Sequence, residues 1–261
     1  MNDFYTDTLQ ELLNKNLITQ HMRILVVCGG EHDKQALEHT GFQNVTISNL
    51  DTRMKGNEFA PFVWTLQDAE KIAFKDNEFD FCIAHDGLHH CRSPHRALLE
   101  MYRVAVCGLL VFEPRDSIVA RLGVLLNFGQ EYEVSGISWN DFNYGGVENT
   151  EIPNYVYRWS EREVKKTISS FAPWGRHRFF FFYRLRIPWM RLRALRNKFW
   201  LITAYALHPF LRVFTWIFPK QCNNFAFAVF RPPVPQNLHP WIEHREGEFR
   251  INRPWLQQRY Q

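Results

Sequence analysis

Apolar and polar positions along the first 118 residues follow patterns that predict five strands separated by short helices. Short apolar runs bounded by turn residues predict buried strands, whereas apolar positions three or four residues apart predict helices. The strands are expected at residues 24–28, 44–51, 62–68, 79–90 and 108–114, and the helices at 6–17, 33–39 and 93–105. This order predicts a doubly wound α/β sheet, in which ligands bind beyond the carboxyl ends of the strands.

Charged residues are unevenly distributed along the 261 residues. The net charge is +4, yet residues 164–242 contain 13 Lys or Arg and no Asp or Glu. A segment this basic is expected to face an anionic partner. No recognised nucleic-acid-binding module accompanies it, so nucleic acid is not the expected partner.

The five cysteines form no CxxC pair, and three of them lie in or beside apolar runs. Free buried thiols are typical of a reducing compartment, and no metal site is predicted. The first residues, "MNDFYTDTLQELL", carry acids where a signal peptide would need bases, so export is not indicated. We therefore expect a cytoplasmic protein.

Several short motifs stand at the ends of the predicted strands. The first strand ends in "CGGEH", the second in "SNLD", and "DAEKIAFKDNEFDFCIAHDGLHH" connects an Asp-Ala pair to a His-rich loop. In this order and spacing, roughly residues 20–118 resemble class I S-adenosylmethionine-dependent methyltransferases, particularly the type 11 methyltransferase domain family. The resemblance implies S-adenosylmethionine as cofactor and S-adenosylhomocysteine as product. It also implies a Rossmann-like sheet of seven strands, completed by antiparallel pairing of residues 178–187 with a final strand at 225–230.

The resemblance places a cofactor site at these strand ends. Small residues let the backbone approach a ligand closely, and a carboxylate can accept hydrogen bonds from both ribose hydroxyls. In the family the first loop lines the methionine moiety, the Asp-Ala pair holds adenine, and the residue ending the fourth strand lies beneath the sulfonium. The residues implied here are Cys28, Gly29, Gly30, Asp68, Ala69 and His85.

The first loop departs from the family's three glycines. Cys28 and His32 stand at the first and third positions, and only Gly30 is retained. An ordinary strand-to-helix corner without a ligand is the alternative interpretation. The ribose acid aligns either with Asn49 or with Asp51, whose side chains share one face of a strand. We favour Asp51 because a charged acceptor binds a diol more strongly.

Methyl transfer to a hydroxyl requires a group that takes up the proton. The candidates for this catalytic base lie in "AHDGLHH", with His89 first, and after the fifth strand; they are His89, His90, His85, Asp86 and Glu113. Two alternatives stay open. In one, the histidines serve only to shape the loop. In the other, Glu113 forms an ion pair with Arg115 and takes up no proton.

Residues 129–158 contain four tyrosines and a tryptophan. This loop either roofs the acceptor pocket, with Trp139, Tyr144, Tyr155 and Arg158 as substrate contacts, or packs on the sheet as a surface excursion. Ser160 followed by Glu163 then predicts the start of a helix.

Residues 188–220 form a basic, aromatic insertion that is expected to be helical. Within it, residues 199–218 include 15 apolar positions in 20, the length of a membrane span, but His208, Pro209 and Arg212 interrupt them. We expect a helical hairpin bent at Pro209 that covers the active site or lies on a membrane surface; a solvated cap is the alternative. The bases that suit anionic head groups or an anionic acceptor are Arg184, Arg186, Arg191, Arg193, Arg196 and Lys198.

We therefore expect one methyltransferase domain over residues 1–235, with the cofactor-binding core at 20–118, and a C-terminal tail at 236–261. The expected activity is O-methylation of a small or lipid-linked anionic acceptor: a sugar, a polysaccharide precursor or a secondary metabolite. One alternative is methylation of a lipid or quinone at the inner membrane face. Another is a binding or scaffold module that has lost the cofactor. The sequence leaves the acceptor and the oligomeric state open.

Overall fold

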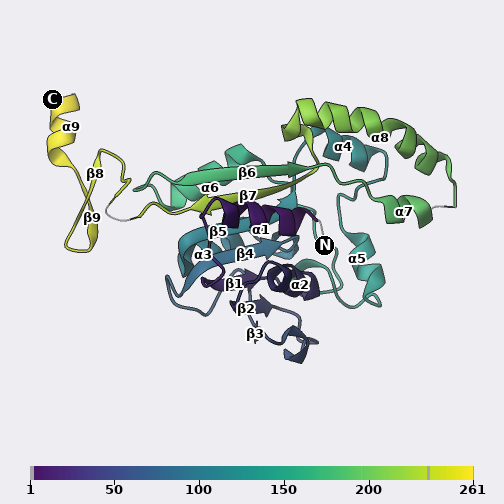
Figure 1. Cartoon of the computed structure of the whole chain (residues 1–261), viewed down its shortest axis with the longest axis horizontal. Coiled ribbons are helices and arrows are strands. Elements are labelled where there is room, and N and C mark those ends of the chain that lie inside the picture. Colours follow the sequence, from purple (N-terminus) through teal and green to yellow (C-terminus); the bar gives the residue numbers. More distant parts are fainter. Residues whose placement is uncertain (1–2, 195, 234–235, 261) are drawn as a thin grey trace.

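A seven-stranded sheet forms the centre of the computed structural model, which describes residues 3–194, 196–233 and 236–260 (Figure 1). Its strands are β1 (Arg23–Val27), β2 (Asn44–Asn49), β3 (Val63–Leu66), β4 (Phe79–His85), β5 (Ala105–Pro114), β6 (Arg178–Arg184) and β7 (Asn224–Phe230). They lie in the order β3-β2-β1-β4-β5-β7-β6. Strands β1 to β5 pair in parallel, and β7 runs antiparallel to both β5 and β6. The predicted doubly wound sheet with an antiparallel final strand is confirmed.

Helices cover both faces of this sheet and bury its alternating apolar side chains. The helices are α1 (Phe4–Asn14), α2 (Glu31–His39), α3 (Pro94–Val104) and α6 (Glu161–Phe171). Helices α1 and α2 pack on one face, where Leu9 and Leu37 meet Ile83. Helices α3 and α6 pack on the other, where Leu98 and Ile168 are buried in the same cluster as strand residues.

The connections before and after β3 contain no α-helix in the described chain, and the sequence predicts none there. Between β2 and β3 the described chain has only a 3-10 turn (Asn57–Phe59), and between β3 and β4 it has no helix. Both connections are rich in charged residues and lack a repeating apolar stripe, so a helix there would have no face to bury.

Side-chain caps define where the helices begin. The Ser93 hydroxyl accepts a hydrogen bond from the Arg96 amide at the start of α3, and Pro94 occupies the first turn. The Ser160 hydroxyl accepts from the Glu163 amide at the start of α6, which confirms the predicted cap. The Glu163 carboxylate does not close the capping box, because it accepts a hydrogen bond from the Tyr157 hydroxyl.

A second group of helices lies beyond the carboxyl ends of the parallel strands (Figure 1). They are α4 (Ile118–Leu125), α5 (Val134–Trp139), α7 (Trp189–Ala194) and α8 (Phe199–Ile217), with 3-10 turns at Leu88–His90, Val147–Asn149 and Pro219–Gln221. The hairpin predicted to bend at Pro209 is wrong, because α8 continues through that residue. The reversal instead lies between α7 and α8, where the Trp189 and Tyr205 rings stack 4.7 Å apart. No helix in the described part of the chain is long and apolar enough to cross a bilayer.

The C-terminal residues are folded rather than a simple tail. They form a hairpin of β8 (Ile242–Arg245) and β9 (Glu248–Ile251), followed by α9 (Arg253–Tyr260). This unit projects from the end of the molecule opposite α7 (Figure 1). It joins the body where the Trp174 ring stacks on Phe249, 4.9 Å apart. The predicted boundary at residue 235 lies outside the described residues.

Candidate active site

A cavity of about 250 Å³ lies where the carboxyl ends of β1, β2 and β4 meet. The residues predicted at the cofactor that line it are Cys28, Asn49, Asp51, Asp68 and Ala69. Gly87 and His90 also border it, and so do five residues of the loop 129–158: Asn140, Gly145, Gly146, Glu148 and Asn149. The cavity therefore lies where a parallel sheet binds its ligand.

The turn after β1 keeps the backbone shape of a glycine-rich loop although it has lost glycines. Cys28 adopts φ +55°, a left-handed conformation that favours glycine, at the position of the family's first glycine. A Cβ on Gly29 would lie 2.7 Å from the side chains of Val26 and Ile47, so the backbone is in close contact with the core. Gly30 is the N-cap residue of α2, and its amide donates to the Asp33 carboxylate at 2.8 Å.

The two candidate ribose acceptors make different contacts. The Asn49 amide donates to the Gly29 carbonyl and its oxygen accepts from the Asp51 amide, so its side chain holds the loop together. The Asp51 carboxylate is 2.6 Å from the Arg53 guanidinium, and this hydrogen bond lowers the pKa of Asp51. Asp51 therefore stays ionised, which favours it as the acceptor for a diol.

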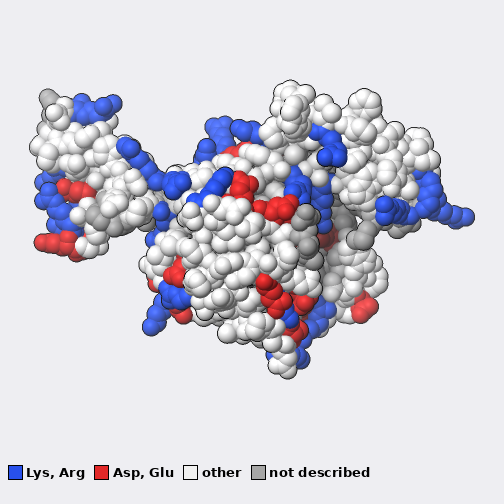
Figure 2. Space-filling model, viewed as in Figure 1, with Lys and Arg blue, Asp and Glu red and all other residues white. Residues whose placement is uncertain are grey.

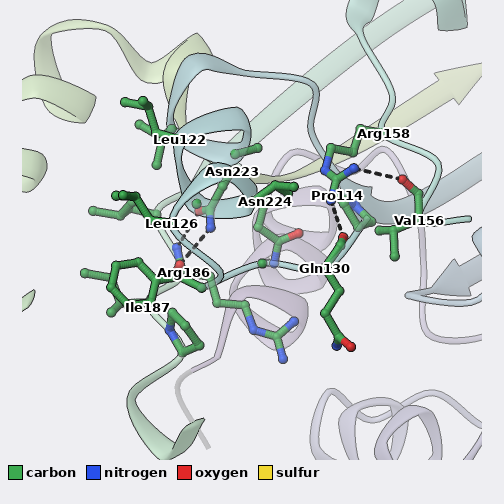
Figure 3. Close-up of a pocket in the computed structure, with 18 of the residues that line it drawn as sticks. Pro114, Leu122, Leu126, Gln130, Val156, Arg158, Arg186, Ile187, Asn223 and Asn224 are labelled. Atoms are coloured by element: carbon green, nitrogen blue, oxygen red, sulfur yellow. Dashed lines mark hydrogen bonds between the residues drawn. The ribbon is translucent and has the colours of Figure 1, made fainter. Parts of the chain in front are cut away.

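A second and larger cavity, of about 520 Å³, lies between α4, α8 and the segment after β6 (Figure 3). Its lining is mostly apolar, with Leu122 and Leu126 from α4 and Leu211 from α8. Figure 3 shows Gln130 and Arg158 on the side opposite Leu122 and Leu126. The cavity thus combines an apolar wall with a polar end.

Asp86 and His90 border both cavities. Asp86 follows β4 in a left-handed conformation, φ +48°, and its carboxylate is 3.2 Å from the Arg186 guanidinium. His90 ends the 3-10 turn Leu88–His90. Reacting groups held in the two cavities would meet at these two residues.

Behind this junction lies a buried pair of a histidine and a carboxylate. His89 Nδ1 is 2.6 Å from a Glu113 carboxylate oxygen, and both side chains are almost fully buried. His89 Nε2 is 3.4 Å from the Glu133 carboxylate, and His90 Nε2 is 3.5 Å from the same oxygen. Four ionisable side chains from three separate parts of the chain therefore converge here.

Their environment changes the proton affinity of three of these groups. Burial acts to lower the pKa of His89, but the nearby Glu113 and Glu133 carboxylates outweigh burial and raise it well above its usual value. Burial and the neighbouring His89 lower the pKa of His90. Burial opposes ionisation of Glu133, yet the hydrogen bond and charge of His89 lower its pKa to about 2.

Comparison with known proteins identifies the core that carries this site. Residues 25–112 match the family model of the methyltransferase domain. This segment belongs to the methyltransferase domain family. The family predicted for this segment and the enzyme class are thereby confirmed.

Solved structures of several methyltransferases are similar to this chain at low sequence identity. An S-adenosylmethionine-dependent methyltransferase of Thermotoga maritima is 14% identical, with 85% of this chain and 88% of that chain covered and a TM-score of 0.47. Magnesium protoporphyrin IX methyltransferase of Synechocystis, with bound S-adenosylhomocysteine, is 13% identical, with 87% and 81% covered and a TM-score of 0.49. A search of curated protein sequences found no match to this chain.

Three residues predicted at the methyltransferase cofactor lie outside the two cavities. Gly29 and Gly30 form the turn between β1 and α2, and neither borders the 250 Å³ cavity. His85 stacks on the Tyr5 ring, 4.7 Å away, and also packs against Phe112. Contacts of these three residues with the cofactor stay predictions.

The candidate bases of the methyltransferase lie in different surroundings. His89 is held between two carboxylates, and Glu113 is fully buried and borders neither cavity, so Glu113 positions His89. The alternative pairing of Glu113 with Arg115 is wrong, because the Arg115 guanidinium lies 2.8 Å from Glu161. His90 is the histidine that borders both cavities.

The loop 129–158 contributes to the walls of both methyltransferase cavities, which favours the roof over the surface excursion. Arg158 lines the larger cavity, where its guanidinium donates to the Val156 and Gln130 carbonyls. The aromatic residues predicted at the substrate lie outside both cavities. Trp139 is 81% exposed, Tyr155 is 48% exposed, and Tyr144 packs under the Arg53 guanidinium.

Sequence reasoning missed two residues of this site. Glu133 comes from the middle of the loop and reaches His89 and His90. Arg53 covers the Asp51 carboxylate and also donates to Asn140 of the loop. The local sequence around Arg53 carries no signal of this role. For Glu133, the acids of "GQEYEV" in an otherwise aromatic loop were an available signal.

The close contact at Gly29 leads to a stability prediction. Gly29→Ala is expected to lower the free energy of unfolding by about 1–3 kcal/mol, because its Cβ would overlap Val26 and Ile47 in the core. Gly30→Ala is the matched control, since a Cβ there has nothing within 4 Å, and it should cost at most about 1 kcal/mol of N-cap preference. Denaturant unfolding of both variants measures the difference. Equal losses would contradict the close contact.

Proposed function

We propose that this methyltransferase transfers the methyl group of S-adenosylmethionine to a hydroxyl of a lipid-linked, anionic acceptor at a membrane surface. The observation that carries the proposal is the 520 Å³ cavity, mostly apolar, which meets the cofactor-side cavity at Asp86 and His90. An acceptor with an apolar body and a polar head would fit this combination.

The cofactor-side cavity supplies donor and acceptor groups that suit S-adenosylmethionine. The ionised Asp51 carboxylate would accept from the ribose hydroxyls, and Asp68 with Ala69 would hold adenine. When bound, the cofactor would supply an electrophilic methyl carbon, with S-adenosylhomocysteine as the leaving group. Asp86 at the junction would take up the proton of the acceptor hydroxyl. The residues at the junction would align the acceptor oxygen with this carbon and exclude water.

The polar end of the larger cavity favours an anionic head group. Arg186 lies at the junction, with its guanidinium 3.2 Å from Asp86, so it can pair with an acceptor anion without leaving the site. Arg158 adds a second positive charge to the same end. A small free sugar would leave the apolar wall of α4 and α8 without a partner, which favours the lipid-linked member of the expected acceptors.

The outer face of α8 supports a location at a membrane. The helix is apolar on both sides: its inner residues line the larger cavity, while its outer residues are exposed. The outer face, which we call the arm surface, consists of Ile202, Phe210, Val213, Trp216 and Ile217, together with Leu125 of α4. Figure 2 shows a broad uncharged area over α8 with Lys and Arg at its edges. An exposed apolar helix with basic flanks is typical of interfacial binding to anionic lipids.

Methyl transfer into lipid tests the proposal directly. The protein is incubated with S-adenosylmethionine labelled on the methyl group and with vesicles made from a lipid extract of the source organism. We expect label in the organic phase, and none with Asp51→Ala, because cofactor binding is lost. Water-soluble sugar and metabolite fractions are supplied in parallel. Label found in those fractions instead of the organic phase would overturn the lipid-linked acceptor but not the methyltransferase activity.

A further inference from the structure

Three potential metal ligands lie together at the edge of the larger cavity. One potential ligand atom from each of His89, His90 and Glu133 lies within 4.8 Å of the other two. A Glu133 carboxylate oxygen is 3.4 Å from His89 Nε2 and 3.5 Å from His90 Nε2. All three side chains border the 520 Å³ cavity.

The two separations from the Glu133 oxygen are close to those around a tetrahedral metal ion. Ligand atoms about 2.0–2.1 Å from zinc at tetrahedral angles lie about 3.3 Å from each other. Binding of a cation would therefore need little movement of the Glu133 oxygen relative to either histidine nitrogen. Two imidazoles and one carboxylate are also a common ligand set for catalytic zinc, with the fourth position left open.

We propose that His89, His90 and Glu133 bind one divalent cation of the zinc class, and that its open position faces the acceptor cavity. The part of this inference that concerns the acceptor rests on the proposed function. The binding of the cation itself does not. It departs from the sequence-based expectation, which contained no metal site.

Each ligand is held by a further contact, as metal ligands generally are. The Glu113 carboxylate is 2.6 Å from His89 Nδ1, the ring nitrogen that faces away from the proposed cation. The His90 ring has a hydrogen bond to the backbone of Gly146. The Asn154 amide donates both to the Glu133 carboxylate, at 3.4 Å, and to the His89 carbonyl, at 3.1 Å. The ligand geometry is therefore built before any cation arrives.

The charge of the cluster also favours a cation. Glu113 is fully buried and Glu133 is 27% exposed, and His89 lies directly between them. Two carboxylates this close to one another need a positive charge, which either a proton on His89 or a metal ion can supply. The Arg186 guanidinium at the junction is already paired with Asp86.

A cation here would act on the acceptor rather than on the cofactor. Its open position faces the cavity whose end His90 shares with the cofactor site. A hydroxyl bound to a divalent cation would lose its proton more readily, here to the Asp86 carboxylate that borders both cavities, so its oxygen would become a better nucleophile at neutral pH. The cation would also fix that oxygen close to the incoming methyl carbon.

Cation binding by the full-length protein tests the proposal. The protein is dialysed against a chelator and titrated with CoCl₂, whose visible absorption reports tetrahedral coordination, and with ZnCl₂ in a calorimeter. We expect one ion per chain and a tetrahedral cobalt spectrum. Glu133→Gln and His90→Ala should each weaken binding at least about tenfold, and Glu113→Gln about 10–100-fold through the orientation of His89.

Two controls separate this site from others. His95→Ala removes a histidine outside the cluster, and Cys91→Ser removes a thiol beside the cofactor cavity that could bind zinc itself. Both should keep full affinity. Absence of stoichiometric binding by folded protein, or unchanged binding by folded Glu133→Gln and His90→Ala, would overturn the proposal. Titration of the same samples with S-adenosylhomocysteine shows separately whether the cofactor site is intact.

Discussion

Asp51→Ala is expected to weaken the binding of S-adenosylhomocysteine at least about 100-fold, which corresponds to about 2.7 kcal/mol. The carboxylate lies in the wall of the 250 Å³ cavity and stays ionised beside Arg53. Two hydrogen bonds from ribose hydroxyls to a charged acceptor contribute about 1.5–3 kcal/mol each. Removal of the carboxylate also leaves the Arg53 guanidinium without its main partner, which adds to the loss.

Isothermal calorimetry of wild type and variant with S-adenosylhomocysteine measures this effect. Asp76→Ala is the matched control, because Asp76 is 71% exposed and pairs with Arg103 away from the cavity. Asp51→Asn keeps the shape of the side chain and should still lose most of the affinity. If Asp51→Ala binds normally and Asn49→Ala does not, the ribose acceptor is Asn49. If wild type itself binds no cofactor, the chain is a binding module on a methyltransferase fold.

The second large effect concerns the arm surface. Replacing Ile202, Phe210 and Trp216 together with serine is expected to reduce binding to anionic vesicles at least about 100-fold. Full burial of one large apolar side chain contributes about 1.5–3 kcal/mol. The three side chains are 67%, 74% and 82% exposed, so their loss should disturb the folded protein little.

Co-sedimentation with vesicles of phosphatidylcholine and phosphatidylglycerol measures this binding. The control is the pair Val63→Ser and Leu66→Ser on β3, which are exposed apolar residues far along the sheet from α8. Binding should weaken in salt and with purely phosphatidylcholine vesicles, because the basic residues around the arm surface lose their partners. Wild-type protein that stays in the supernatant with anionic vesicles would show that the arm surface serves another purpose.

Both results bear on one arrangement in the molecule. The inner face of α8 lines the acceptor cavity and its outer face forms most of the arm surface, so a single helix separates the acceptor from the proposed membrane. If the arm-surface variant loses vesicle binding but keeps its affinity for the cofactor, the arm surface serves only to deliver the acceptor. Residues of the cofactor site and of the arm lie on separate elements, so the two sets of variants should act independently.

The local sequence was sufficient to predict the core of the fold. Apolar runs predicted the five parallel strands, and the Ser160 cap predicted the start of α6. The cofactor-side residues were predictable for a topological reason, because the carboxyl ends of parallel strands meet at one edge of the sheet. Asp51 and Asp68 therefore had to lie near each other as soon as their strands were recognised.

Other features required the tertiary structure. Proline usually interrupts a helix, yet α8 continues through Pro209. The aromatic ring of Trp139 looked like a substrate contact, but it lies on the outside of its helix. A side chain's direction from an irregular loop depends on contacts with distant segments, which no local pattern encodes.

The sequence by itself determined the class of sheet, the methyltransferase family and the edge at which the cofactor site lies, because these depend on local periodicity and motif order. Only the tertiary structure decided that Glu133 reaches His89 and His90, that Arg53 covers Asp51, and that α8 walls an apolar cavity. These contacts join segments far apart in the chain, so they depend on how the loop and the arm fold back over the sheet.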